Sequence, residues 1–311
     1  MTLTELKYVV AVAREKHFGR AAEACFVSQP TLSVAIKKLE EELDVKIFER
    51  GASEVSVTPL GEQIVRQAQQ VIEQAQALKE IAKRGKDPIS GPLRLGIIYT
   101  IGPYLLPDLV RQAIERVPQM PLLLQENFTA RLLEMLRTGE LDCAIMAEPF
   151  PDTGLAVAAL YDEPFMVAVP TGHALAKRKS ISAEELKQET MLLLGTGHCF
   201  RDHVLEVCPE YARFASPSSN GSEGIRKSFE GSSLETIKYM VASGMGVTVV
   251  PQLSVPKEKQ PHIRYIKFSA PAPTRRVVLA WRRTFTRYEA IAALRNAIHA
   301  CPLPGVKRLS V

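Results

Sequence analysis

Cys199 and Cys208 lie nine residues apart in a segment whose residue types favour thiol chemistry, LLLGTGHCFRDHVLEVCPE. His198 precedes the first cysteine, and Arg201 and Asp202 follow it. A thiol reacts with peroxide as the thiolate, and a nearby arginine or a helix N-terminus lowers its pKa. The resulting sulfenic acid condenses with a second thiol to give a disulfide. The segment therefore predicts a redox-active pair, with burial of both cysteines in the core as the alternative.

The spacing of the two cysteines restricts how they could join. Val204, Leu205 and Val207 are compatible with a helix over residues 200–208. Nine residues of helix rise about 13.5 Å and turn the chain by about 180°, which places the two sulfurs on opposite faces. A disulfide needs Cα atoms within about 7 Å. We therefore expect this segment to unwind before the bond can form.

The remaining cysteines and the histidines suggest no further chemistry. Five cysteines, with no CxxC pair, argue against a disulfide framework and against zinc ribbons. We expect Cys25, Cys143 and Cys301 to be core residues. The six histidines form no HxH or HxxH pattern, so neither a metal nor another cofactor is expected.

The sequence shows no export signal and no apolar run of the roughly 20 residues that span a bilayer. It is therefore expected to be cytoplasmic, with no membrane partner.

From residue 92 onward, apolar runs with period two alternate with helical patterns, which predicts an α/β fold with mostly parallel sheets. One helix is expected to begin with a capping box from Ser232 to Glu235. Ligands of such sheets sit beyond the carboxyl ends of the strands. The residues that follow strands 93–98 and 121–125 are therefore candidate pocket walls: Tyr99, Thr100, Asn127, Phe128 and Thr129.

The first 58 residues have the pattern of a winged helix-turn-helix. A capping box from Thr2 to Glu5 begins one helix, a short helix fits residues 19–24, and Ser28 can cap a third. Leu32, Ile36, Leu39 and Leu43 form an apolar stripe on that third helix. Its other faces, with a wing over residues 47–59, are expected to contact DNA. The candidate contacts are Ser28, Gln29, Pro30, Thr31, Ser33, Lys37 and, in the wing, Arg50. A small helical domain with solvated polar residues is the alternative.

The net charge does not itself indicate DNA binding. The chain has a formal net charge of +5, but residues 1–90 hold 13 basic and 13 acidic residues. The excess lies in residues 257–311, with 12 basic residues against 2 acidic ones. The N-terminal motif must therefore carry the argument for DNA.

A long helix is predicted from Thr58, as its cap, to about Arg84, with Gly85 after its end. Apolar residues follow one another at three- and four-residue steps: Ile64, Ala68, Val71, Ala75, Leu78 and Ala82. This is a coiled-coil seam, which predicts a homodimer and a near-palindromic operator in double-stranded DNA. The alternative is that the stripe packs on its own domain.

The N-terminal pattern AAEACFVSQPTLSVAIKKLEEELDVKIFERGASEVSVTPLGE resembles the DNA-binding signature of LysR-type transcriptional regulators. The resemblance implies a periplasmic-binding-protein-like sensing domain with two Rossmann-like lobes. It divides the chain into a winged helix-turn-helix (1–58), a dimerisation linker helix and hinge (59–91), and a two-lobed regulatory domain (92–311). Lobe I covers about 92–163 and 269–301, and lobe II about 164–268. Tetramers built from dimers and contact with RNA polymerase are also implied.

The GHCFRD…C motif resembles the peroxide-sensing members of that family. The resemblance implies an activator of antioxidant genes in which hydrogen peroxide oxidises Cys199 and Cys208 resolves the sulfenic acid. It further implies peroxide binding by Thr100, Thr129, His198, Asp202 and Arg275, with Arg276 as the other candidate arginine. A long polar loop over 216–231 departs from the family. A regulator that responds to a small carboxylate or aromatic effector is the nearest alternative, and a thiol peroxidase is the alternative from another class.

Overall fold

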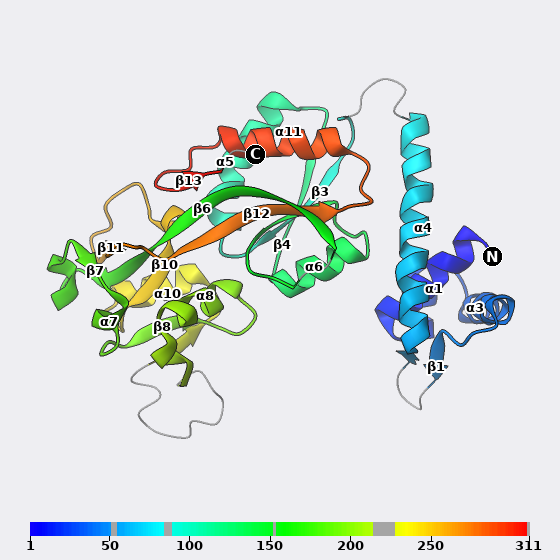
Figure 1. Cartoon of the computed structure of the whole chain (residues 1–311), viewed down its shortest axis with the longest axis horizontal. Coiled ribbons are helices and arrows are strands. Elements are labelled where there is room, and N and C mark those ends of the chain that lie inside the picture. The colour runs from blue at the N-terminus through cyan, green and yellow to red at the C-terminus, as the bar shows by residue number, and fades with distance from the viewer. Residues whose placement is uncertain (51–54, 84–88, 152–153, 214–227, 310–311) are drawn as a thin grey trace. The chain divides into compact units, whose positions relative to one another are not determined.

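The computed structural model describes residues 1–50, 55–83, 89–151, 154–213 and 228–309. The chain forms two compact units (Figure 1). One comprises Met1–Pro88 with Thr284–Thr286, and the other comprises Ile89–Arg283 with Arg287–Val311. Among the described residues, no helix combines the length and the hydropathy that a membrane span requires.

The N-terminal unit is a three-helix domain with a two-stranded wing and a long fourth helix. Its elements are α1 (Leu3–Glu15), α2 (Phe18–Ala24), α3 (Gln29–Leu43), β1 (Phe48–Arg50), β2 (Val55–Val57) and α4 (Pro59–Lys83). The predicted capping box at Thr2 and Glu5 is confirmed, with both of its hydrogen bonds present. Ser28 caps α3 as predicted, and Thr58 accepts from the backbone N–H of Gly61 at 2.9 Å.

A buried carboxylate connects α3 to the wing. Leu32, Ile36 and Leu39 form the buried stripe of α3, and Glu40 lies beside them with 9% of its surface exposed. Its Oε1 accepts from the backbone N–H groups of Ile47, at 2.8 Å, and Phe48, at 3.1 Å. Because a backbone N–H that is buried without a partner is costly, this carboxylate fixes where β1 begins.

The apolar stripe of α4 is divided between two roles. Ala68 belongs to the core of the N-terminal domain, and Ile64 packs against that core. Val71 and Leu78 are 37% and 68% exposed. The prediction of one continuous coiled-coil seam is therefore wrong for the first part of the helix, because its apolar residues there pack against the core of their own domain. The predicted helix end at Arg84 and Gly85 lies outside the described residues.

The C-terminal unit is built on a mixed sheet of nine strands with helices packed against it (Figure 1). Its principal strands run in the order β4-β3-β5-β12-β6-β11-β7, and β10 and β13 pair with β6. The strands are β3 (Leu93–Ile98), β4 (Leu122–Asn127), β5 (Cys143–Ala147), β6 (Leu155–Pro170), β7 (Ser180–Ile181), β10 (Thr248–Pro251), β11 (Ile263–Phe268), β12 (Thr274–Arg282) and β13 (Lys307–Arg308). A separate parallel pair comprises β8 (Met191–Leu194) and β9 (Ser228–Gly231).

The helices of this unit are α5 (Gly102–Arg116), α6 (Thr129–Arg137), α7 (Ala183–Leu186), α8 (Cys199–Val207), α10 (Leu234–Ala242) and α11 (Tyr288–Ala300). Short 3₁₀ turns are η1 (Ala174–Lys177), η2 (Pro209–Arg213) and η3 (Gln252–Ser254). Ser233, not Ser232, caps α10, so the predicted capping box is wrong. The carboxylate of Glu235 instead accepts from Tyr104 at 2.6 Å and from Lys238 at 2.9 Å.

The long strand β6 divides the sheet into two parts. Up to Pro164 it pairs with β12, and from Phe165 onward it pairs with β10 and β11, antiparallel in each case. The expectation of mostly parallel sheets is therefore wrong, because two long strands run antiparallel through the middle. The change of partner supports the two-lobe division that we propose, with lobe I at 92–163 and 269–301 and lobe II at 164–268.

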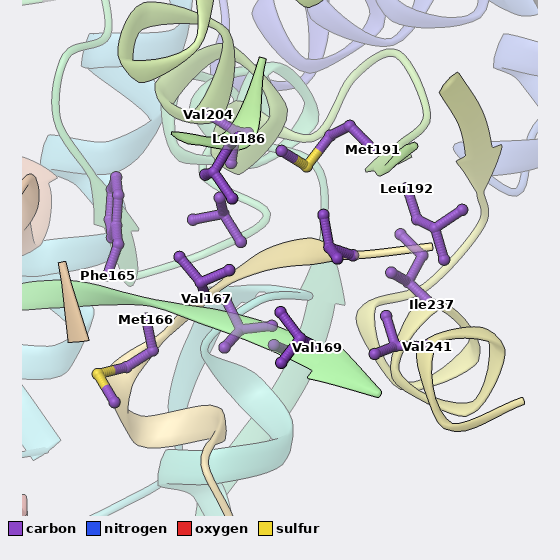
Figure 2. Packing of buried hydrophobic residues seen from close by; sticks show 14 of the residues in the cluster. Phe165, Met166, Val167, Val169, Leu186, Met191, Leu192, Val204, Ile237 and Val241 are labelled. Carbon is purple, nitrogen blue, oxygen red and sulfur yellow. The ribbon is translucent and has the colours of Figure 1, made fainter. Parts of the chain in front are cut away.

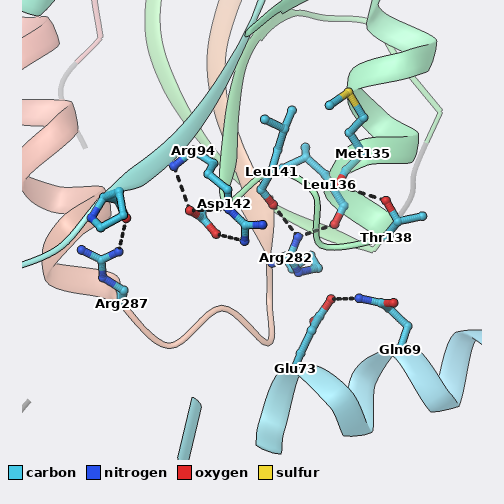
Figure 3. A network of polar contacts seen from close by, with 11 residues as sticks. Gln69, Glu73, Arg94, Met135, Leu136, Thr138, Leu141, Asp142, Arg282 and Arg287 are labelled. Carbon is cyan, nitrogen blue, oxygen red and sulfur yellow. Dashed lines mark hydrogen bonds and ion pairs between the residues drawn. The ribbon is translucent and has the colours of Figure 1, made fainter. Parts of the chain in front are cut away.

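Different interactions stabilise the two lobes. Figure 2 shows apolar side chains of β6, β8 and α10 converging in lobe II, where Val204 of α8 joins them. In lobe I, arginines hold backbone and carboxylate oxygens (Figure 3). Arg94 makes a two-pronged bond to Asp142, and Arg282 and Arg287 donate to the carbonyls of Leu141 and Pro92, both at 2.7 Å. Part of the basic excess of residues 257–311 is therefore structural.

We predict that Glu40→Ala destabilises the N-terminal domain by about 2 kcal/mol, because two backbone N–H groups lose a charged acceptor. Hydrogen exchange measured by mass spectrometry should rise across residues 45–58. Glu41→Ala, at an exposed position on the same helix, is the matched control. Equal exchange in the two variants would contradict the role assigned to Glu40.

Candidate functional site

A small pocket lies where β3 and β4 end, against the first turn of α8. It has a volume of about 170 Å³ and is partly open to solvent. Its lining residues are Ile98, Tyr99, Thr100, Asn127, Phe128, Thr129, Gly197, His198 and Cys199. All five wall residues expected from the strand ends are among them. The space in it is enough for about one water-sized molecule, so this pocket suits a ligand of a few atoms.

The Cys199 thiol is half-buried at the first position of α8. Burial raises its pKa above the ordinary thiol value, while the Thr129 hydroxyl and the Arg275 guanidinium act to lower it. Thr129 Oγ1 is buried and has no other hydrogen-bond partner among the described residues. That hydroxyl is therefore free to bond to a small molecule placed beside the sulfur.

Arg275 is buried behind the pocket wall. Its Nη1 donates to Thr100 Oγ1 at 2.8 Å, and its Nη2 donates to the Thr100 carbonyl at 3.0 Å. The fully buried Glu163 holds the other side of the guanidinium, with Oε2 accepting from Nε at 2.9 Å. Arg276 is exposed and pairs with Asp162 at 2.8 Å, as expected for the next residue of a strand. Of the two candidate arginines, Arg275 is the one beside the pocket.

An aromatic cluster closes the pocket at the junction of the two lobes. The His198 ring lies edge to face with Phe128, at 4.8 Å between centroids, and with Tyr99, at 6.0 Å. Its Nε2 lies 3.2 Å from the Ser232 carbonyl. Burial lowers the pKa of His198, so the ring is neutral at pH 7 and donates one hydrogen bond to that carbonyl.

Two charged residues next to Cys199 lie differently from expectation. Arg201 is buried and donates to Glu230 at 2.6 Å. The expectation that Arg201 lowers the thiol pKa is therefore wrong, and Arg275 has that effect. The Asp202 side chain is exposed and does not line the pocket. Sequence reasoning missed Glu163, whose only signal was a carboxylate within the strand pattern YDEPF.

Cys208 lies at the other end of α8, fully buried in the lobe II core. Burial raises the pKa of its thiol to about 12. Both cysteines are free, and the segment between them is helical, with which its apolar residues are compatible. Cys143 and Cys301 are buried and Cys25 is half-buried, which agrees with their assignment to the core.

The candidate DNA-contacting residues occupy the N-terminal face of α3. The exposed ones are Ser28, Gln29, Pro30, Thr31 and Lys37, and Ser33 is half-buried. The hydroxyls of Ser28 and Thr31 are 2.8 Å apart, so both also contribute to the helix cap. Arg50 ends β1, but its side chain lies outside the described part of the structure.

Two family models match the chain. Residues 3–62 match the bacterial regulatory helix-turn-helix protein model of the lysR family, and residues 86–301 match the LysR substrate binding domain. The chain belongs to the LysR family of bacterial transcription regulators. It is thus a DNA-binding regulator rather than an enzyme.

Curated relatives and solved structures are similar over almost the whole chain. The hydrogen peroxide-inducible genes activator of Pectobacterium carotovorum is 38% identical over 94% of this chain and 95% of its own length. OxyR of Escherichia coli K12 is 38% identical over 94% of each. A full-length OxyR from Pseudomonas aeruginosa with the substitution C199D is 51% identical over 97% of this chain and 99% of its own, with a TM-score of 0.77. A hydrogen peroxide-bound cysteine mutant of Corynebacterium glutamicum OxyR is 33% identical over 96% and 91%, with a TM-score of 0.62.

The raised pKa of Cys199 predicts a pH-dependent reactivity. Since the thiolate is the nucleophile, alkylation by iodoacetamide should accelerate roughly tenfold per pH unit from pH 6 to 8, without a plateau. The rate is followed by mass spectrometry of the Cys199 peptide in a Cys25→Ser background. Thr129→Val should slow the reaction at each pH, because it removes a group that lowers the thiol pKa. A rate that is flat above pH 6.5 would show instead that the thiol pKa is depressed.

Proposed function

We propose that this protein senses hydrogen peroxide through Cys199 and changes the transcription of antioxidant genes in response. The observation that carries the proposal is the pocket itself, where the Cys199 sulfur meets the Thr129 hydroxyl in a space suited to a few atoms. The similarity to hydrogen peroxide-inducible genes activators of other bacteria supports the same effector.

The first step oxidises Cys199. Its thiolate attacks one oxygen of hydrogen peroxide, the O–O bond breaks, and an S–O bond forms. The product is a sulfenic acid, and the departing hydroxide takes up a proton to become water. The proposed peroxide-binding residues are Thr100, Thr129, His198, Asp202 and Arg275. Thr129 has a free hydroxyl, and Arg275 stabilises the thiolate and orients Thr100. Asp202 could take part only after the first turn of α8 moves.

The second step joins Cys199 to Cys208. The Cys208 sulfur displaces hydroxide from the sulfenic acid, an S–S bond forms, and the thiol proton leaves with that oxygen as water. A separation of nine positions keeps the thiols about 13.5 Å apart along the helix axis, so α8 must unwind first. Unwinding also withdraws Cys208 from the lobe II core. We propose that this rearrangement is the signal passed to the DNA-binding domain.

The rival functions fit the pocket less well. None of the residues that line the pocket carries a charge that could pair with a carboxylate effector. A thiol peroxidase must turn over repeatedly, whereas in this protein each formation of the Cys199–Cys208 disulfide requires α8 to unfold. Peroxide consumption at no more than about one equivalent per dimer subunit would favour the sensor.

We propose further that the regulator acts on double-stranded DNA at a near-palindromic operator. The exposed face of α3 provides the base contacts and Arg50 a phosphate contact. Val71 and Leu78, exposed apolar residues of α4, support a homodimer, and the family resemblance extends this to a homotetramer that contacts RNA polymerase. Since its DNA lies in the bacterial cytoplasm, the protein is expected to act there.

The two cysteines should give different products. After brief peroxide treatment, wild-type protein should yield a peptide linked through Cys199 and Cys208, detected by mass spectrometry. Cys208→Ser should retain a sulfenic acid at Cys199 that dimedone traps, and Cys199→Ser should give neither product. DNase footprints of reduced and oxidised protein should differ for wild type and be identical for Cys199→Ser. A peroxide-dependent footprint in Cys199→Ser would reject Cys199 as the sensor.

The exposed apolar residues of α4 should hold the dimer. Val71→Glu with Leu78→Glu places like charges in that interface and should yield monomers in sedimentation velocity, with loss of operator affinity. Gln70→Glu with Gln76→Glu adds the same charge at exposed polar positions of the same helix and should leave the dimer intact. If both double variants remain dimeric, the interface lies elsewhere.

A further inference from the structure

One histidine in the middle of α8 joins the two lobes. His203 is 5% exposed, and its Nε2 lies 2.8 Å from the backbone carbonyl of Glu148. Glu148 directly follows β5 in lobe I, where its own N–H donates to the carbonyl of Arg276 at 2.9 Å. The acceptor is therefore held by the lobe I sheet, while the donor belongs to the helix that must unwind.

The protonation of His203 follows from its surroundings. A carbonyl oxygen can only accept, so Nε2 carries the proton and donates. Nδ1 is buried without a hydrogen-bond partner among the described residues. Burial lowers the pKa of this ring, and the nearby Arg275 acts in the same direction. A neutral ring with a single, desolvated hydrogen bond results.

Aromatic packing gives that ring one orientation. Phe165 of β6 and Phe200 of α8 lie 6.2 and 6.4 Å from the His203 ring, centroid to centroid, and 5.1 Å from each other. Both phenylalanines are buried. The Arg275 guanidinium lies over the Phe200 ring at 5.1 Å. The bond to Glu148 is thus aligned by buried side chains, one of which packs against Arg275, and its geometry is preorganised.

Two other polar contacts at this end of α8 stay within lobe II. Arg201 donates to Glu230 of β9, which is within lobe II. His198, at the helix cap, bonds to Ser232 in the same lobe. These contacts can move with lobe II, whereas the bond of His203 must break if α8 unwinds or shifts relative to lobe I.

We propose that His203 is a positioning residue that holds α8 in its helical, reduced form by tethering it to lobe I, and so sets the rate of disulfide closure. The inference rests on the proposed function, since it concerns the second redox step. In that step the Cys199–Cys208 bond forms, the S–O bond of the sulfenic acid breaks, and water leaves. Because His203 does not line the pocket, it affects this step and not the attack on peroxide.

The test separates the two steps in full-length protein mixed with hydrogen peroxide. Dimedone trapping measures sulfenic acid formation, and mass spectrometry of acid-quenched samples measures disulfide closure. His203→Phe keeps a ring in the aromatic cluster but removes the donor. We expect unchanged sulfenic acid formation and closure about three- to tenfold faster, the effect of losing one hydrogen bond from the reduced state. Glu206→Gln, at an exposed position of the same helix, should behave as wild type.

Two further variants keep the test decisive if the phenylalanine protein folds poorly. His203→Gln retains an N–H donor at a similar reach and should restore the wild-type closure rate. His203→Asn is shorter by one methylene, cannot reach the carbonyl, and should close as fast as His203→Phe. If wild type forms the 199–208 disulfide but all three variants close at the wild-type rate, the tether is refuted while peroxide sensing stands. If wild type forms no such disulfide, the proposed function itself fails.

Discussion

The geometry of one helix governs the rest of this molecule. Cys199 and Cys208 lie at opposite ends of α8, which keeps their sulfurs on different faces and about 13.5 Å apart along its axis. No side-chain rotation can bring the sulfurs within bonding distance, since a disulfide requires Cα atoms within about 7 Å. A chemical event at one thiol therefore has to become a conformational event before the second thiol can respond. The contacts that α8 makes with the two lobes maintain that separation. Breaking them is the free-energy cost of forming the disulfide.

The pocket combines two opposing influences on its thiol. Burial favours the neutral sulfur, while Arg275 and Thr129 favour the thiolate. The charge of Arg275 is balanced by the buried Glu163, whose second oxygen accepts from the N–H of Leu253 at 2.7 Å. A buried arginine without such a partner would be expensive, because both desolvation and its unused donors count against it. The positive field at Cys199 is consequently fixed in place and moderate, which suits a thiol that must stay reduced until a small oxidant enters.

Many helices and strands and the pocket walls could be predicted from the sequence, because they follow from local patterns of residue types. The strand ends predicted Tyr99, Thr100 and Phe128 as pocket walls, and the apolar residues between the two cysteines were compatible with the helix observed there. The register of β6 and β12 could not be predicted from the sequence. Antiparallel pairing of strands that lie far apart in the chain depends on the whole fold and not on periodicity. The pairing of Arg275 with Glu163, 112 residues apart in the chain, could not be predicted for the same reason. Nor could the partner of Arg201, because this residue is close to Cys199 in the chain but points to another face of the helix. Long-range pairs of this kind leave no trace in spacing.

The burial of Cys208 explains why the reduced state is selective as well as stable. Its thiol lies in the lobe II core with a pKa raised to about 12, so it is a poor nucleophile toward any oxidant that arrives from solvent. The neighbouring Tyr211 is also buried and donates to the carbonyl of Glu189 at 2.9 Å, which anchors the chain just after α8. Extracting Cys208 must therefore disturb packed apolar side chains, a cost that only a covalent bond can offset. In the proposed mechanism that bond forms only with an already oxidised Cys199, so oxidation at the pocket changes the fold of lobe II only when Cys208 leaves the core.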